Sequence, residues 1–437
     1  MAKKNDTNTT TLAGERIGFR PIVKSEPEWL YRLRKQGWEF YHDTPLPPRA
    51  DHLWRYTDPG LFVMENLEEQ MKIVPVEADN LVQDIRAMSP EHAAFGYNRS
   101  TLLTFAQMTP QLADQGVIFN DLASAVLENV DLLKDNMGAL IGPQFGKFEA
   151  LNMALWNNGL FLHIPNNTVI EKPIYLHRHP TGKHTIQRLL IVLGDNVQAT
   201  FIDDYSCHCR YEEAVANSAV EIQAGGSVNL KYINLQRLAD DNSTYVTVRS
   251  RIGRDSNIYS LFGGFGSTNL KVNAGTILTG RGSSSHMSGV LFADGGQHFD
   301  YHTRHHHAAS ESYSELDFKV VLKDKGTSAY TGLIRIEKDA VNCEAYQENR
   351  NLLLNEGTRA ESIPELEILT DEVRCTHGAT MGPVDPEMLF YLKSRGLSKS
   401  EAVKAVVGGF LASTLKNAPD ETGEDIRKLV DEKLKGM

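Results

Sequence analysis

A thiol and an imidazole stand two residues apart near the C-terminus, at Cys375 and His377. Val373 to His377 reads as an extended segment, and side chains two apart on a strand point to the same face. A neighbouring imidazolium lowers the pKa of a thiol, and thiolate is the form that accepts sulfur or binds iron. The pair is therefore a candidate sulfur or iron site. The competing interpretation is a small buried cysteine beside a hydrogen-bonded histidine.

A second group is rich in histidine, because six of the fifteen histidines lie between residues 286 and 307. His305, His307 and Glu311 reproduce the His-x-His-x3-Glu core of a cupin metal site, in which alternate residues of one strand bind a divalent ion. The match is partial, since phenylalanine occupies both places where that motif has glycine. The alternative is that these side chains stack on successive coils of a β-solenoid or face solvent.

The other cysteines and the glycine-rich runs give weaker signals. Cys207 and Cys209 flank His208 as in half of a zinc site, but no second cysteine pair lies at a suitable spacing. Cys343 is expected to be a packed small residue on a strand. Gly142 to Phe148 is one residue too short for a Walker A loop and lacks the Ser or Thr that holds magnesium. ATP hydrolysis would therefore need another chain.

Composition excludes several classes of protein. The chain has 437 residues and a formal net charge of -11, which argues against wrapping nucleic acid, because that task needs clustered Lys and Arg. Four cysteines are too few for a secreted disulfide framework. No apolar run approaches the roughly 18 residues that span a bilayer, and the polar start lacks the apolar stretch of a signal peptide. We expect a cytoplasmic protein that binds neither nucleic acid nor membrane.

Residues 1–150 predict a mostly helical N-terminal domain. Ser25, Pro27 and Glu28 supply an N-cap, an early proline and a capping-box glutamate, so a helix should begin there. A second helical signal covers residues 121–137, where apolar residues recur at spacings of three and four.

The pattern changes in residues 151–372, where short β-type runs are separated by Gly, Asn and Asp. A loose unit of one glycine, a few polar residues and an apolar strand recurs there at intervals of roughly thirty residues. Each coil of a solenoid needs its neighbour to cover one face, so this recurrence is typical of solenoids. An ordinary β-sandwich is the alternative that the irregular repeats leave open.

After His377 the chain is predicted to return to helix, so that residues 373–437 form a C-terminal helical domain. Asp385 and Pro386 mark a helix start, Gly396 marks a stop, and Ser398 marks a second start. The expected helices cover residues 386–395, 399–416 and 422–435.

The run from Glu365 to Asp385 closely resembles the C-terminal signature of the SufB/SufD family, scaffold proteins of iron–sulfur cluster assembly, and in particular its SufD branch. The resemblance extends over most of the chain, through Trp54–Asp58, Leu151–Ala154, Phe161–Pro165 and Gln347–Leu354. It implies a mainly β fold with a right-handed parallel β-helix core flanked by N-terminal and C-terminal helical domains. The resemblance thus favours the solenoid over the sandwich.

The resemblance also implies a role for the thiol and imidazole pair. In the family, a cysteine and a histidine that match Cys375 and His377 take part in building a transient iron–sulfur cluster at the junction with a SufB-like subunit. The SufB branch typically has glutamate at the position of Gly378. This departure favours the SufD branch and implies that the chain supplies one side of a shared site.

Tyr391, Arg395, Gly396 and Leu397 match the family's segment that docks SufC, an ATPase of the ABC type. The implied protein is a non-catalytic scaffold subunit with no tightly bound cofactor of its own. A reduced flavin could supply electrons to its complex, and the isolated chain could form a homodimer. The rival hypothesis is a cupin-like metalloenzyme, with the C-terminal helices serving only for oligomerisation.

Overall fold

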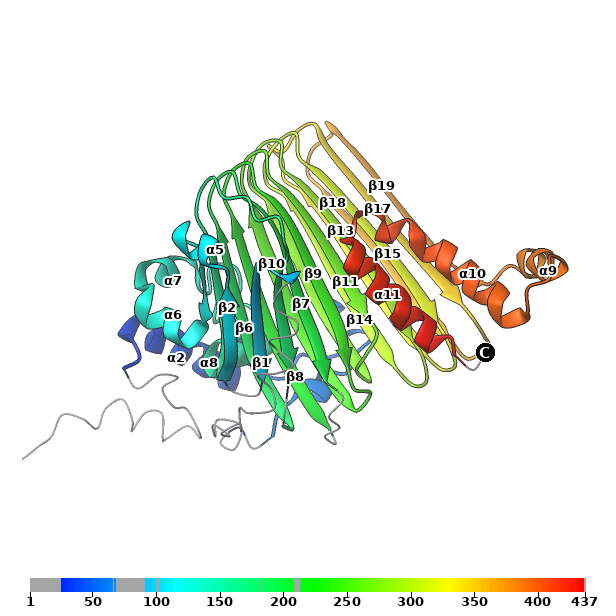
Figure 1. Ribbon diagram of the computed structural model, residues 1–437, viewed down its shortest axis with the longest axis horizontal. Coiled ribbons are helices and arrows are strands. Elements are labelled where there is room, and N and C mark those ends of the chain that lie inside the picture. Colours follow the sequence, from blue (N-terminus) through cyan, green and yellow to red (C-terminus); the bar gives the residue numbers. More distant parts are fainter. Residues whose placement is uncertain are drawn as a thin grey trace, which may run out of the picture.

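A parallel β-solenoid of about eight turns forms the centre of the molecule, with helices at both ends (Figure 1). This computed structural model describes residues 25–65, 67, 91–99, 102–180, 182–207 and 213–435. The prediction of a mainly β solenoid flanked by helices is confirmed.

Successive strands of the solenoid alternate between two sheets, so each coil contributes one strand to each sheet. The ten-stranded sheet runs in the order β2 (Leu102–Met108), β1 (Ala94–Arg99), β5 (Ile174–His179), β7 (Gln198–Cys207), β9 (Asn229–Leu238), β11 (Asn257–Gly264), β13 (Ser284–Ala293), β15 (Tyr313–Leu322), β17 (Cys343–Leu353) and β19 (Val373–Pro383). The nine-stranded sheet runs in the order β3 (Ile118–Asp121), β4 (Asn158–Ile164), β6 (His184–Leu193), β8 (Ala214–Ala224), β10 (Asn242–Ile252), β12 (Asn269–Leu278), β14 (His298–His307), β16 (Thr327–Ile336) and β18 (Arg359–Ile368).

The recurring glycines of the sequence lie at the turns, where adjacent coils come close together. A Cβ on Gly194 would lie 2.2 Å from Asn166 Oδ1 in the preceding coil, and a Cβ on Gly253 would lie 2.5 Å from Gly225 O. Only a residue without a side chain fits such an approach. The repeat is irregular in sequence because Asn, Asp or Ser can adopt the positive φ of these turns, as Asn196 does at φ 55° in the same turn as Gly194.

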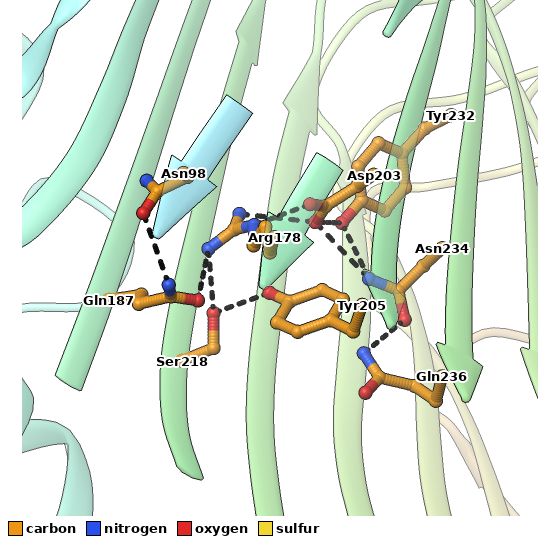
Figure 2. Close-up of polar contacts among 9 residues, drawn as sticks. All are labelled: Asn98, Arg178, Gln187, Asp203, Tyr205, Ser218, Tyr232, Asn234 and Gln236. Atoms are coloured by element: carbon orange, nitrogen blue, oxygen red, sulfur yellow. Dashed lines mark hydrogen bonds and ion pairs between the residues drawn. The ribbon is translucent and has the colours of Figure 1, made fainter. Parts of the chain in front are cut away.

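Apolar side chains from both sheets fill most of the interior of the solenoid. A polar network interrupts them near the N-terminal end, where the buried Arg178 donates to Asp203 across 2.5 Å (Figure 2). Tyr232 and Asn234 donate to the same carboxylate at 2.9 and 3.2 Å. Because a buried charge is costly without partners, these donors allow Asp203 to lie inside the solenoid.

The N-terminal helices cover the first coils. α2 (Glu28–Asp43) follows Pro27 as predicted, although Pro27 itself is the N-cap and Ser25 makes no cap. The predicted helix over 121–137 is divided at Asn129, and Asp121 caps its first half. The helical segments that follow α2 are η1 (His52–Trp54), η2 (Pro59–Phe62), α5 (Pro110–Asp114), α6 (Leu122–Glu128), α7 (Val130–Asn136) and α8 (Lys147–Leu155). The described part of residues 1–150 also contains β1 to β3, so it is a mixed segment.

The C-terminal segment forms α9 (Pro386–Ser394), α10 (Lys399–Ala412), η4 (Thr414–Asn417) and α11 (Asp420–Lys433). The predicted helix starts are confirmed, since Asp385 caps α9 and Ser398 forms a capping box with Glu401. Apolar residues of α10 and α11 pack on the outer face of the ten-stranded sheet, whereas α9 projects away from the sheets (Figure 1). Sheet pairing continues past the predicted boundary at residue 372, as far as Pro383.

Candidate functional site

The last coil of the solenoid, made of β18 and β19, ends both sheets. β19 pairs with β17 and β18 pairs with β16, and within the described residues no strand pairs with their other edges. At the opposite end, the antiparallel strands β2 and β3 and the N-terminal helices close the structure. The solenoid therefore has one covered end and one open end, and an open edge presents backbone donors and acceptors to another chain.

Cys375 and His377 lie on β19, at the open end. Cys375 is opposite Ala345 of β17, and His377 is opposite Gln347, both of which are buried on the interior side. Cys375 is half-buried against the interior apolar residues, and His377 is exposed. The extended conformation predicted for this run is confirmed, and the pleat of the strand directs both side chains to the same face.

The electrostatics of the thiol differ from the sequence expectation. Burial raises the pKa of Cys375 to about 11, so the expected lowering by a neighbouring imidazolium is wrong for this chain alone. Desolvation disfavours the charged thiolate, and it acts here without a compensating cation. The thiol is consequently protonated at neutral pH, and a thiolate at this position needs a ligand or a charge from outside the chain.

The predicted cupin-like metal site is wrong. His305 and His307 point into the solenoid, where His305 Nε2 lies 2.9 Å from Ser285 Oγ and His307 Nε2 lies 2.7 Å from Ser314 Oγ. Burial lowers the pKa of His307 to about 4, so its imidazole is neutral.

Glu311 does not join these histidines. It occupies an exposed turn with φ 56°, and its carboxylate pairs with Arg281 Nε at 2.8 Å. In the part of the chain that the structure describes, no group of three or more His, Cys, Asp or Glu side chains could hold a metal ion. The alternative reading, histidines stacked within a solenoid, is correct for His305 and His307.

The other two thiols that the structure describes are buried. Cys343 Sγ lies 3.2 Å from Ser312 Oγ and 3.3 Å from Ala340 O, as expected of a packed small residue on a strand. Cys207 Sγ lies 3.5 Å from His179 Nε2, at the end of β7. Cys209 lies outside the described residues.

The predicted ATPase-docking residues lie on and just after α9. No residue of α9 is buried, and the side chains of Phe390 and Tyr391 are 75% and 56% exposed. Arg395 lies over the Tyr391 ring at 5.4 Å, and Gly396 at φ 96° ends the helix before Leu397. Clustered exposed aromatic and Arg side chains are typical of binding surfaces.

Three further features are a cavity, the length of the helices and the open strand edge. A cavity of about 550 Å³ lies beside the starts of β6, β8, β10 and β12, away from the last coil. None of the described helices is long and apolar enough to cross a membrane. The site that sequence reasoning missed is the open strand edge itself, because only the strand order shows which strands lack a neighbour.

Known protein families and individual relatives match most of the chain. Residues 176–410 match the family model described as SUF system FeS cluster assembly, SufBD core domain, and residues 20–176 match the SufBD protein N-terminal region. The iron-sulfur cluster assembly protein SufB of Bacillus subtilis and an iron-sulfur cluster assembly SufBD family protein of Staphylococcus saprophyticus are each 25% identical to the chain over 427 residues. Each alignment covers 95% of this chain and 91% of the relative. The chain therefore belongs to the SufB/SufD family of the SUF iron–sulfur cluster assembly system.

Proposed function

We propose that the chain is a SufD-like scaffold subunit that pairs with a SufB-like subunit through its last coil and helps to assemble iron–sulfur clusters in a reducing cytoplasm. The observation that carries this proposal is that Cys375 and His377 stand on β19, a strand with an open edge. A further strand can add to such an edge through backbone hydrogen bonds. The free thiols of Cys343 and Cys375 agree with a reducing compartment.

The chemistry of the pair also favours a shared site. Iron in a cluster is bound mainly by thiolates, and one half-buried thiol with one exposed imidazole is an incomplete ligand set. A homologous partner at the open edge would cover His377 and supply further ligands. It could also supply the charge that Cys375 needs to ionise. The cluster is the cargo of this site, so the chain alone is proposed to be a scaffold subunit and not an enzyme.

The assignment to the SufD branch rests on the residue after the histidine. This chain has Gly378, whereas the SufB branch typically has glutamate there. A glycine adds no carboxylate to the junction, so an acidic ligand or base would come from the partner. Partnership of two unlike subunits is thus favoured over two copies of this chain.

We further propose that α9 and the turn after it dock a SufC-like ATPase. α9 has no buried residue, and it exposes Phe390 and Tyr391. Water contact of these aromatic side chains has a free-energy cost that a partner would remove. Because α9 leads directly into α10, and α10 and α11 pack on the solenoid, a force applied at α9 could reach the coils near Cys375.

Cluster assembly can be tested by co-expressing the tagged chain with SufB-like and SufC-like proteins and measuring iron and sulfide in the purified complex. We expect His377→Ala to keep the complex but lose the cluster. Thr376→Ala is the matched control, because Thr376 is also exposed on β19 and should change nothing. An intact cluster in His377→Ala would reduce the chain to a structural subunit, and no complex at all, or only a homodimer, would overturn the proposal.

ATPase docking can be tested by measuring capture of the SufC-like protein on the immobilised chain. Arg395→Glu reverses the charge beside Tyr391 and should abolish capture without unfolding the protein. Lys393→Glu reverses an exposed charge on the same helix and should leave most of the binding. Equal capture by wild type and Arg395→Glu would place the docking surface elsewhere.

A further inference from the structure

A short segment from the N-terminal region crosses the outer face of the nine-stranded sheet. This segment, residues 52–62, comprises η1, η2 and the chain between them, and we name it the strap. It contacts strands more than 180 residues later in the sequence, from β10 to the last coil. Five adjacent strands, β10 to β18, span roughly 19 Å at about 4.8 Å for each spacing.

The first attachment is aromatic and lies on β10. The Trp54 ring stacks on Tyr245 with centroids 5.5 Å apart and an interplanar angle of 23°, and Phe62 lies 5.6 Å from the same ring. All three side chains are buried. Stacked aromatic pairs contribute stabilisation beyond that of their buried area. These contacts therefore stabilise the position of the strap on β10.

The second attachment is a buried ion pair under the strap. Lys271 of β12 donates to Asp300 of β14 at 2.7 Å, and both side chains are fully buried. Thr57 of the strap donates its hydroxyl hydrogen to the same carboxylate, and the ring of Trp54 lies 5.0 Å from Lys271 Nζ. The strap thus covers the charged pair and adds a hydrogen bond to its carboxylate. A buried ion pair is tolerated when its charges have such additional hydrogen-bond partners.

The strap then reaches the strands at the open end. Thr57 Oγ1 lies 3.0 Å from His298 Nε2, and His298 Nδ1 lies 2.8 Å from Thr327 Oγ1 on β16. At the far end of the strap, His52 Nε2 lies 3.1 Å from Glu365 Oε1 on β18. Contacts of one segment therefore extend from β10 to the terminal strand.

We infer that the strap is a positioning element, which ties the last coil to the N-terminal half of the molecule and fixes the open edge for the partner. In a solenoid each coil contacts only its neighbours, so the terminal coil lacks one source of stability. Such end units open locally more often than interior units. A segment that connects the terminal coil to coils further inside the solenoid stabilises it against such opening. The inference rests on the proposed function in one respect, because it assigns the partner to the edge that the strap holds.

Hydrogen exchange of the whole chain tests the strap without any partner. Thr57→Val keeps the side-chain shape and removes the hydroxyl, so amides of β16 and β18 should exchange about tenfold faster, as for a lost hydrogen bond to a charged group. Strands β6 and β8 at the other end should keep their rates. Thr57→Ser should restore the wild-type rates. Thr279→Val is the matched control, since Thr279 lies on a turn away from the strap.

His52→Ala gives a second, milder variant, because both His52 and Glu365 are partly exposed. It should raise exchange in β18 alone. Unchanged exchange in β18 for both variants, or equal acceleration in every strand, would overturn the positioning role.

Capture of the SufB-like partner completes the test. Thr57→Val should slow association with the partner, whereas Thr279→Val should not. If wild type captures no partner, the proposed function fails while the exchange result still decides on the strap. If exchange rises in β18 but association stays at the wild-type rate, the strap steadies the coil without positioning the edge, and the inference is overturned.

Discussion

The reactivity of Cys375 follows from its surroundings on β19. Its thiol is half-buried against apolar residues, and burial raises its pKa to about 11. We predict slow alkylation by iodoacetamide near pH 7.5 and a rate that rises about tenfold for each pH unit up to the pKa, since thiolate is the nucleophile. Mass spectrometry of the Cys375 peptide measures this rate.

His377→Ala serves as the decisive comparison for this prediction. If burial controls the thiol, removal of the imidazole should leave the alkylation profile of the free chain unchanged. Rapid alkylation at pH 7 that disappears in His377→Ala would instead restore the activated thiol that the sequence suggested. Cys375→Ser identifies the signal, because Cys343 and Cys207 are buried and should react more slowly.

The interior histidines should make stability depend on pH. Burial lowers the pKa of His307 from about 6.5 to about 4, so the unfolded chain binds a proton that the folded chain does not. This contribution to stability is present above about pH 6.5 and is lost as the pH falls through about 4. The loss amounts to about 3 kcal/mol for this residue alone. Urea unfolding at pH 7 and at pH 4 measures it.

The matched variant for this prediction is His307→Asn, which keeps a donor and an acceptor but does not titrate. Its free energy of unfolding should fall less between the two pH values than that of wild type. Glu311→Gln should lose much less stability to acid than the buried imidazole accounts for, because the Glu311 carboxylate is exposed and pairs with Arg281 instead of with a histidine. An equal pH dependence in His307→Asn and wild type would contradict a neutral buried imidazole.

For single residues, the side of the strand to which a side chain points was predictable from the sequence, whereas the pKa of the thiol was not. The common face of Cys375 and His377 follows from the two-residue period of a strand, which is a local property. The thiol pKa depends on packing between coils thirty residues apart, so spacing could not show it. The His305, His307 and Glu311 pattern failed for a similar reason, because the glutamate falls on the turn after β14.

Among the elements, helix ends were predictable because caps are local. Asp385 and Ser398 each hydrogen-bond to a backbone N–H two or three residues on, and both helices begin where these residues indicated. The helix over 121–137 was only partly predicted, since Asn129 interrupts it. The choice between solenoid and sandwich was not local. Both have short strands and turns, and only the register between successive coils distinguishes them.

Coil stacking gives a prediction for one interior glycine. Gly289 of β13 is opposite Phe318 of β15, and a Cβ there would lie 2.1 Å from the phenyl ring. Gly289→Ala should destabilise the protein by about 1–3 kcal/mol, because Phe318 is fully buried and has little room to move. Chemical denaturation measures the change. Gly296→Ala is the control, as nothing lies within 4 Å of its added methyl.

If Gly289→Ala and Gly296→Ala had the same stability, the coils would be looser than this packing implies. A large loss in both would mean that the Phe318 ring is not the main cause of the destabilisation. The expected pattern, a loss in the first alone, would show that interior positions tolerate no added volume. It would also explain why glycine occupies this interior position of β13, opposite a large ring.

The whole molecule is asymmetric along the solenoid axis. Among the residues that the structure describes, antiparallel strands and helices cover the N-terminal end, while β18 and β19 leave the C-terminal end open (Figure 1). The helices at both ends were predicted from the sequence. The difference between a covered and an open end was not, because β2 and β3 lie in a segment that was predicted to be mostly helical. The open end nevertheless holds Cys375 and His377, for which the family resemblance implies a place at a junction between subunits.

An open edge on a chain of this kind should lead to self-association when the proper partner is absent. We expect the isolated chain to form a concentration-dependent dimer, measurable by analytical ultracentrifugation. Ala379→Lys places a charge on the exposed middle of β19 and should return the chain to a monomer, since pairing would bury that charge. Ala113→Lys, exposed on α5 at the covered end, is the matched control.

The two lysine variants distinguish pairing at the β19 edge from a general effect of added charge on association. Each adds one positive charge to a chain of net charge -11, so an effect of charge alone would appear in both. Dissociation in Ala379→Lys alone would assign the contact to β19, and the same variant should then fail to capture a SufB-like partner. A dimer that persists in Ala379→Lys would mean that the chain associates through another surface, of which the exposed aromatic residues of α9 are the first to test.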